Sequence, residues 1–382
     1  MPNFTWKDKI IPFNPNLLDD PLFKVNQYDK VDNQAIIDIS KTHDSDFLKY
    51  LINSSSVYWK KKKKTTDELI EEDTHLLNKL CAIGYLLHTF RDDSKTYAVI
   101  AMDLEESEIG ESNGGTGKSL LGYALSNILT DAYIAGKKRR LFDDDFVFEQ
   151  VNERTDLLFF DDVRTNFDFE FLYPVITGKM MVNPKNKSKF TLNKNDVPKV
   201  YISTNHAVKD NGKSDKRRQY IIGFSDYYHP DRSPKDEFKR NLFSNEWDFE
   251  QWNQFYNLMA LAVQAYFKYG KIEAPNRTII QRKLRQDIGE DFIQWAEIYF
   301  FQESNLSERN NRKELTEDFF QNISANKKKY YSPQKFSKCF RLYAKYKDYR
   351  FNAHIPKTED NPSQRDKTGA NEFFTLTKSS TV

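Results

Sequence analysis

Three short apolar runs, each followed by polar residues, predict an α/β fold with a parallel sheet. The runs cover residues 97–102, 157–160 and 199–203, and a glycine-rich segment, residues 112–119, follows the first of them. Because the carboxyl ends of parallel strands meet at one edge of a sheet, the polar residues that follow these runs are expected to share a crevice. The sequence therefore predicts a phosphate-binding site at that edge.

The glycine-rich segment reads Ser-Asn-Gly-Gly-Thr-Gly-Lys-Ser and is followed by a helix-like run that we expect to end near Thr130. Strand, glycine-rich loop, Lys-Ser and helix is the order of a phosphate-binding loop. Lys118 is expected to reach the β- and γ-phosphates, and the Ser119 hydroxyl to hold Mg²⁺. The predicted nucleotide-binding residues are Asn113, Gly114, Gly115, Thr116, Gly117, Lys118, Ser119 and Leu120. Ser112 stands where the pattern has its first glycine, and the alternative is a glycine-rich turn that precedes Lys-Ser by chance.

Two aspartates end the second run, and an asparagine ends the third. We expect Asp161 to bind Mg²⁺ together with Ser119, and Asp162 to orient the attacking water, a role in which glutamate is commoner. Asn205 can hydrogen-bond the γ-phosphate or that water. The alternatives are a strand that ends in a turn and an asparagine that favours a loop.

Basic residues follow in two places. Lys179, Lys185, Lys187 and Lys189 lie on a predicted hairpin with a turn-rich centre, where they suit contact with nucleic-acid phosphates; a surface hairpin kept soluble by lysines is the alternative. Arg217 and Arg218 come after the third run, separated from it by a loop. Arginine stabilises charge on a phosphoryl group during transfer, so either residue could act on a neighbouring subunit's nucleotide.

The composition excludes several other classes of protein. The chain has 382 residues, 38% of them hydrophobic and 15% aromatic, which is enough for a sizeable core. The two cysteines argue against a disulfide scaffold and a zinc site. No apolar run reaches membrane-spanning length and the N-terminus lacks a signal-peptide pattern, so we expect a soluble cytoplasmic protein without a membrane partner. The formal net charge of +2 leaves nucleic-acid binding to local patches.

The predicted organisation has five parts. They are a loop-rich arm (1–45), a helical subdomain (46–95), a P-loop NTPase core (96–228), a helical extension (229–290) and a basic winged-helix-like domain (291–382). Between residues 311 and 350 there are 11 Lys or Arg against 4 Asp or Glu. That excess suits duplex DNA, and a basic helical bundle that packs on the core is the alternative. The run Lys60–Lys64 is either a solvated face or a nucleic-acid contact.

The phosphate loop, the paired aspartates, the lysine hairpin with the third strand, and the arginines occur in one order that resembles the superfamily 3 helicases. The similarity is to the helicase part of phage and large-virus primase-helicases and covers residues 60–260. It implies an AAA+-like core assembled as a ring, a hexamer, with ATP and Mg²⁺ between subunits. The hairpin would grip single-stranded DNA, a primase could be a partner, and the location would be a bacterial host's cytoplasm. Lys118, Ser119, Asp161, Asp162 and Asn205 would act in cis, and Arg217 or Arg218 in trans.

The sequence thus favours an ATP-dependent DNA helicase or translocase of phage-type replication. A DNA-binding initiator ring that uses ATP for assembly is one alternative, and ATPase measured with and without single-stranded DNA distinguishes it. A P-loop kinase of small molecules is another, which a monomer without DNA binding would favour.

Overall fold

The computed structural model describes residues 20–92, 94–104, 115–138, 141–164, 167–205, 217–275, 288–301, 305–306, 308–347, 349–358, 361, 364–369 and 371–378. The chain separates into two compact units, Met1–Asn276 and Arg277–Val382. The sequence predicts this boundary at residue 290, so the separation falls earlier than expected. The two units are described separately.

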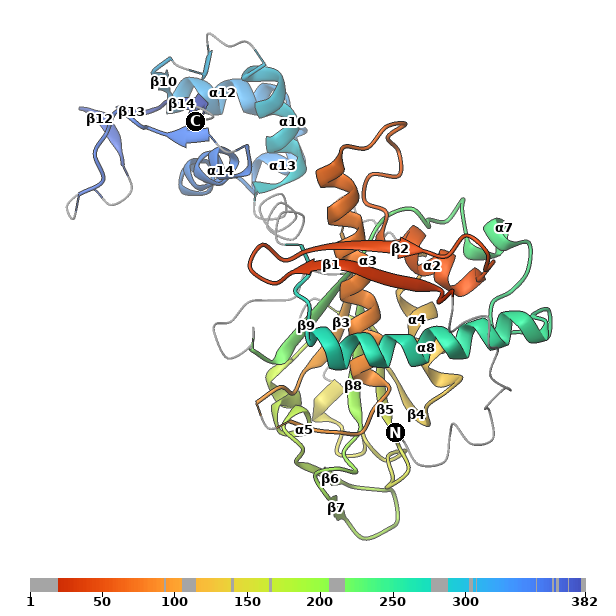
Figure 1. Ribbon diagram of the computed structural model, residues 1–382. Coiled ribbons are helices and arrows are strands. Elements are labelled where there is room, and N and C mark those ends of the chain that lie inside the picture. The colour runs from red at the N-terminus through yellow and green to blue at the C-terminus, as the bar shows by residue number, and fades with distance from the viewer. Residues whose placement is uncertain are drawn as a thin grey trace. The chain divides into compact units, whose positions relative to one another are not determined.

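A parallel five-stranded sheet forms the centre of the first unit (Figure 1), as the sequence predicts. The strand order is β4-β5-β8-β3-β9, so β8 lies between the strand that precedes the phosphate loop and the strand that carries the paired aspartates. The strands are β3 (Ala98–Asp103), β4 (Asp131–Ala135), β5 (Leu157–Val163), β8 (Lys199–Thr204) and β9 (Gln219–Phe224). Every residue of β3 and β8 is buried, which is typical of a parallel sheet covered on both faces.

Different elements cover the two faces of this sheet. Alternate residues such as Val99, Phe159 and Tyr201 pack into one core with side chains of α2, α3, α4 and α8. Their neighbours, such as Ile100, Phe160 and Ile202, pack into a second core with residues of α5, β6 and β7. The helices of the unit are α2 (Asp46–Ser55), α3 (Thr66–Leu86), α4 (Lys118–Ser126), α5 (Tyr173–Ile176), α7 (Pro234–Phe238) and α8 (Phe249–Tyr269), with 3-10 turns at Leu141–Asp143 and Glu170–Leu172.

The long helix α3 begins at Thr66. Thr65 and Glu68 form a reciprocal capping box, which satisfies backbone N–H groups that lack a partner in the first turn. The helix packs closely on α8, because a Cβ atom added to Gly84 would lie 2.0 Å from the carbonyl oxygen of Ala262. In the preceding lysine run, Lys60, Lys61 and Lys64 form ion pairs with Asp226, Glu68 and Glu72, respectively.

The N-terminal arm is not loop-rich throughout, so that part of the prediction is wrong. Strands β1 (Phe23–Asp29) and β2 (Gln34–Ile39) form an antiparallel hairpin. Its pairing is irregular between Val25 and Gln27. Ala35 and Ile37 alternate with exposed neighbours and pack into the first core. The irregularity and the short strands obscured this period of two in the sequence.

A second hairpin leaves the sheet between β5 and β8. Its strands are β6 (Met180–Val182) and β7 (Phe190–Leu192), which pair antiparallel as the sequence predicts. Asn186 adopts a left-handed conformation in the connecting turn, with φ 60°. The helix α5 and Gly178 precede β6, while a turn closed by Asp196 N–H and Asn193 O leads to β8.

The second unit contains helices and short strands around its own core. Ser332 caps α14, and Pro333 is the first residue of that helix. Strands β12 and β13 form an antiparallel hairpin. The strand order β10-β13-β12 places β13 next to β10, the strand that precedes α12. The elements are α10 (Glu290–Tyr299), β10 (Asn310–Asn311), α12 (Arg312–Gln321), α13 (Ala325–Lys328), α14 (Pro333–Tyr346), β11 (Tyr349–Phe351), β12 (Asp366–Thr368), β13 (Asn371–Phe374) and β14 (Leu376–Lys378). In the described parts of both units, no helix has the length and apolar character needed to cross a membrane.

Candidate nucleotide-binding site

The phosphate loop connects β3 to α4 at the carboxyl edge of the sheet. Of its predicted residues, Asn113 and Gly114 lie outside the described residues, as does Ser112. Gly115 and Gly117 have φ of 102° and 100°, a left-handed conformation that glycine adopts without strain. A Cβ atom on Gly117 would lie 2.7 Å from the Tyr50 ring, whose hydroxyl donates to the Gly117 carbonyl at 2.7 Å. A glycine is therefore required at position 117 by both backbone and space.

Lys118 begins α4 but does not reach into solvent. Its side chain is buried, and its ammonium group donates to the Asp103 carboxylate and, at 2.9 Å, to the Thr116 hydroxyl. Thr116 in turn donates to the same Asp103 oxygen at 2.6 Å. A phosphate that binds Lys118 must therefore compete with Asp103, which the sequence analysis did not identify.

The helix α4 ends at Ser126, earlier than the predicted Thr130, because Asn127 caps it and β4 starts at Asp131. Its start has no side-chain cap, since Gly117 occupies that position. Backbone N–H groups of the first turn, which includes Ser119 and Leu120, therefore lack an intrahelical acceptor. Such a helix start favours an anion.

The first aspartate of the pair joins α4 to the sheet. Asp161 Oδ1 accepts hydrogen bonds from the Ser119 hydroxyl at 2.6 Å and from the Ser203 hydroxyl at 2.7 Å. Its other oxygen accepts from the Tyr133 hydroxyl at 3.1 Å. Burial and then the nearby Asp161 raise the pKa of Tyr133 to about 12, so this phenol stays a donor at neutral pH. Residues from α4, β5, β8 and β4 thus meet at one carboxylate.

The second aspartate lies at an irregularity of β5. The pairing of β5 with β8 shifts between Phe160 and Val163, and Asp162 has φ of 56°. Such a bulge re-aims side chains that would otherwise point to opposite faces of the sheet. Asp162 Oδ1 accepts from the Asn205 amide at 3.2 Å, and Oδ2 pairs with the Lys137 ammonium at 2.5 Å. Strain of this kind concentrates at functional sites.

The oxygen atoms of Ser119 and Asp161 fit a Mg²⁺ ion in chemistry and in number. Magnesium in NTPases takes one or two protein oxygens, and its other ligands are phosphate and water. Within the described residues, no group of three or more His, Cys, Asp or Glu could hold a metal, so the chain offers no richer cage there. Ser119 and Asp161 are the residues that would hold the ion.

The two arginines lie at the amino edge of the sheet, where the parallel strands begin, opposite the carboxyl edge. Gln219, which directly follows them, pairs with Ala98 at the start of β3, whereas Asp103 at the other end of β3 pairs with Phe224. Five residue steps of about 3.3 Å separate these ends, roughly 17 Å. Arg217 is exposed, but the Arg218 guanidinium lies over the Tyr173 ring at 4.3 Å. The structure therefore does not bring either arginine to the phosphate loop of its own chain.

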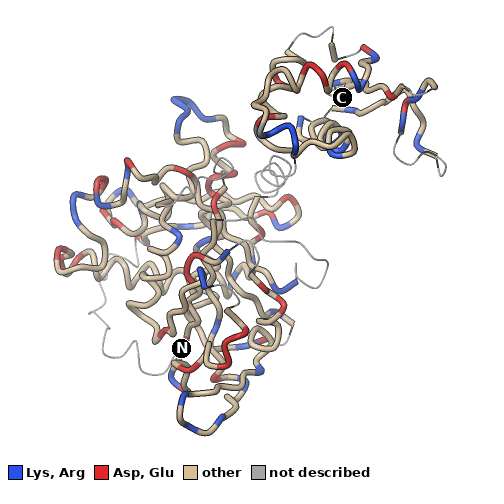
Figure 2. Tube along the Cα trace, turned by 180° about the vertical axis from the view of Figure 1, so that it is seen from behind, with Lys and Arg blue, Asp and Glu red and all other residues tan. Residues whose placement is uncertain are grey.

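The four predicted DNA-binding lysines share one property. Lys179, Lys185, Lys187 and Lys189 are all exposed. Figure 2 shows basic residues, here lysines, in blue along this hairpin. The hairpin lies on the sheet face opposite α3 and α8, since Met180 and Leu192 pack into the second core.

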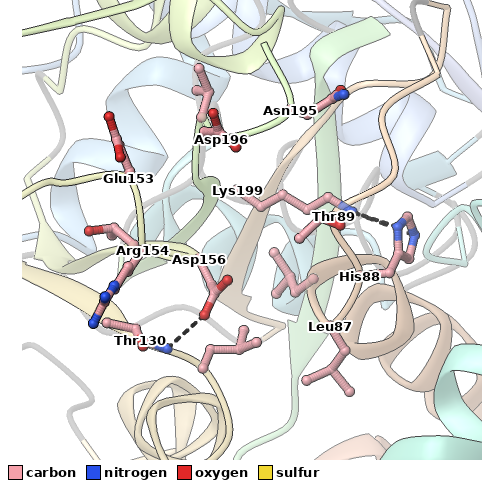
Figure 3. A pocket seen from close by; sticks show the side chains of 14 residues that line it. Leu87, His88, Thr89, Thr130, Glu153, Arg154, Asp156, Asn195, Asp196 and Lys199 are labelled. Carbon is pink, nitrogen blue, oxygen red and sulfur yellow. Dashed lines mark hydrogen bonds between the residues drawn. The ribbon is translucent and has the colours of Figure 1, made fainter. Parts of the chain in front are cut away.

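The amino edge of the sheet borders a cavity of about 880 Å³ (Figure 3). The Lys199 ammonium is buried there and donates to the carbonyl of Tyr85, in the last turn of α3, and to His88 Nδ1 at 3.1 Å. Burial, and then nearby Lys199, lower the pKa of His88 to about 3. No residue of the phosphate loop lines this cavity, so it is separate from the site at the carboxyl edge.

Four residues of the site were missed from the sequence. Asp103 directly follows the first apolar run, so the rule that identified Asp161 and Asn205 could have identified it. Ser203 and Tyr133 lie inside strands, where only the sheet order shows which strands are neighbours. Lys137 belongs to a basic segment, and nothing in the sequence predicts its ion pair with Asp162.

Comparison with known proteins gives structural similarity alone. No family model and no curated protein sequence matches the chain. A solved structure of the NrS-1 C-terminal region is similar with a TM-score of 0.36 and 14% identity, covering 88% of this chain and 76% of that one. A structure of JCV helicase bound to an acetamide compound has a TM-score of 0.30 and 13% identity, covering 63% of this chain and 61% of that one.

Proposed function

We propose that the chain is an ATP-dependent DNA helicase or translocase that works as a ring, with ATP and Mg²⁺ bound between subunits. The observation that carries the proposal is the contact between Ser119 and Asp161, 2.6 Å apart. It joins the phosphate-loop helix to the acidic strand at the carboxyl edge, which is the arrangement that Mg²⁺–NTP binding needs.

The described residues divide the work of hydrolysis. Lys118 and the α4 N-terminus bind the β- and γ-phosphates once Lys118 leaves Asp103. Asp162 orients and accepts a proton from the attacking water, after Lys137 leaves it, and Asn205 holds Asp162 or the γ-phosphate. When bound, Mg²⁺ offsets negative charge on the phosphate oxygens.

The position of Arg217 supports a site between subunits. It is exposed and lies roughly one strand length from the phosphate loop of its own chain. A head-to-tail interface places different surfaces of two copies together and closes into a ring. In such a ring Arg217 of one subunit reaches the nucleotide of the next, and we propose a hexamer.

The hairpin supports DNA as the partner. Four exposed lysines on a short, strongly turned element attract a phosphate backbone without reading bases. We assign Lys179, Lys185, Lys187 and Lys189 to single-stranded DNA, which the hairpins would contact from several subunits.

The second unit supports contact with duplex DNA. A strand, a helix pair and a hairpin in the order β10-β13-β12 fit a winged-helix-like unit. On α14, Lys335, Lys338 and Lys345 are exposed on the side opposite Phe336 and Phe340. This amphipathic helix would present its basic side to the duplex backbone.

ATPase activity with and without single-stranded DNA tests the proposal, combined with sedimentation in the presence of a non-hydrolysable ATP analogue. We expect Mg²⁺-dependent hydrolysis, stimulation by DNA and nucleotide-dependent rings. Hydrolysis that DNA leaves unchanged, in a chain that binds no DNA and stays monomeric, would favour a small-molecule kinase. Rings that bind DNA but do not hydrolyse ATP would indicate an initiator.

A further inference from the structure

Two arginines from outside the β6–β7 hairpin contact the segments that precede and follow it. The chain enters the hairpin through α5 and leaves it through residues 193–198. Arg218, which directly precedes β9, contacts the entry side. Arg91, in the segment between α3 and β3, contacts both sides.

The first contact is a guanidinium stacked on a ring. The Arg218 Cζ atom lies 4.3 Å from the centre of the Tyr173 ring, and Tyr173 is the first residue of α5. Cation–π contacts of this length are directional, because the cation must stay over the ring face. Tyr173 also packs edge-on against Phe169, with ring centroids 5.8 Å apart. Arg218 therefore contacts α5 directly, through the first residue of that helix.

The second set of contacts joins the two segments that flank the hairpin. The Arg91 guanidinium donates to the carbonyls of Ile176, Val197 and Pro198, at 3.0, 2.5 and 2.9 Å. Ile176 ends α5 and the other two precede β8, so one side chain ties the entry to the exit. Gly178, between α5 and β6, has φ of 88°. One guanidinium therefore holds both ends of the hairpin.

We infer that Arg218 is a positioning residue that transmits closure of the intersubunit nucleotide site to the DNA hairpin through Tyr173, with Arg91 as the pivot. The inference rests on the proposed function, because it needs Arg217 to contact the neighbouring subunit's nucleotide. Arg217 and Arg218 are consecutive, so a movement of one carries the other. The two arginines then have different tasks: Arg217 contacts phosphate, and Arg218 moves the hairpin. This differs from the sequence prediction, which treated them as interchangeable.

The test compares variants of the full chain in which the ring at position 173 is removed or retained. Tyr173→Leu removes the ring and keeps an apolar side chain, while the matched control Tyr173→Phe keeps the ring. ATPase is measured without DNA and with an unlabelled poly-dT oligonucleotide, and binding of a fluorescent dT oligonucleotide is followed by anisotropy with and without the ATP analogue. Circular dichroism confirms that each variant is folded.

We expect Tyr173→Leu to keep its DNA-independent ATPase. The factor by which DNA stimulates its ATPase should fall by about fivefold or more, a typical size for coupling between sites. Tyr173→Phe should retain the stimulation. Arg218→Ala should lose the same stimulation, and the double variant no more than either single variant, because both remove one contact. Full stimulation in Tyr173→Leu overturns the inference but leaves the proposed function intact. Wild-type ATPase that DNA does not change overturns both.

Discussion

The two edges of the central sheet are built from the same strands but hold their charged side chains differently. At the carboxyl edge, polar side chains bond to one another: Lys118 to Asp103, and Ser119 to Asp161. At the amino edge, cations bond to backbone carbonyls and rings, as Lys199 does to Tyr85 and Arg218 to Tyr173. Side-chain pairs can be exchanged for a ligand, whereas contacts to the backbone shape the fold. In the proposed function, chemistry therefore belongs to one edge and mechanical coupling to the other.

Removing Lys118 should have the largest effect at the carboxyl edge. Lys118→Ala is expected to lower ATPase by about 100-fold or more, because one charge-stabilising donor is typically worth that much. Lys138→Ala is the matched control, since Lys138 is an exposed lysine that pairs with Asp144. Full hydrolysis by Lys118→Ala would contradict the site assignment.

Asp161→Asn should change the demand for metal. Replacing one of the two protein oxygens that we assign to Mg²⁺ should raise the Mg²⁺ concentration for half-maximal ATPase by about tenfold or more. A Mg²⁺ titration measures it, and exposed Asp145→Asn should behave as wild type. An unchanged titration in Asp161→Asn would remove Asp161 from the metal site.

Asp103→Asn probes the ion pair that a phosphate must displace. Removing one partner of a buried pair leaves the Lys118 charge uncompensated, so the nucleotide-free protein should lose about 3 kcal/mol of stability. Nucleotide should restore most of it, because the phosphates then compensate Lys118. Urea unfolding with and without the ATP analogue measures both. A nucleotide-induced gain no larger than in wild type would show that Asp103 and phosphate do not compete.

The smallest effect is expected at the amino edge and depends on pH. The folded-state pKa of His88 is about 3, below the ordinary value of 6.5, because of burial first and of Lys199 second. The unfolded chain therefore binds more protons between these values, and stability falls as the pH drops below 6.5, by at most about 1.4 kcal/mol per pH unit. His88→Phe should show a shallower loss between pH 7 and pH 4.5 in urea unfolding. An identical slope would exclude His88 as its source.

The sequence predicts the elements that depend on local pattern. The apolar runs, their polar ends and the glycine-rich loop identified β3, β5 and β8, and with them Ser119, Asp161, Asp162 and Asn205 at the carboxyl edge. The β1–β2 hairpin was missed because its alternation is interrupted at Val25–Gln27. The contacts of Asp103 with Lys118 and of Lys137 with Asp162 depend on strand order and on a bulge, neither of which local pattern specifies. The different surroundings of the two arginines were not predictable either: Arg217 is exposed, whereas Arg218 packs on the Tyr173 ring, a contact that depends on the fold.

The central claim is that one nucleotide site takes Lys118 from one subunit and Arg217 from the next, and mixing two inactive variants tests it directly. Lys118→Ala and Arg217→Ala are each expected to be inactive alone. In co-assembled equimolar mixtures, about a quarter of interfaces should combine an intact loop with an intact arginine, because a head-to-tail interface uses different surfaces of its two copies. The account predicts recovered ATPase near that fraction of wild type. Mixed rings without any recovered activity, or an Arg217→Ala variant that is fully active alone, would contradict it.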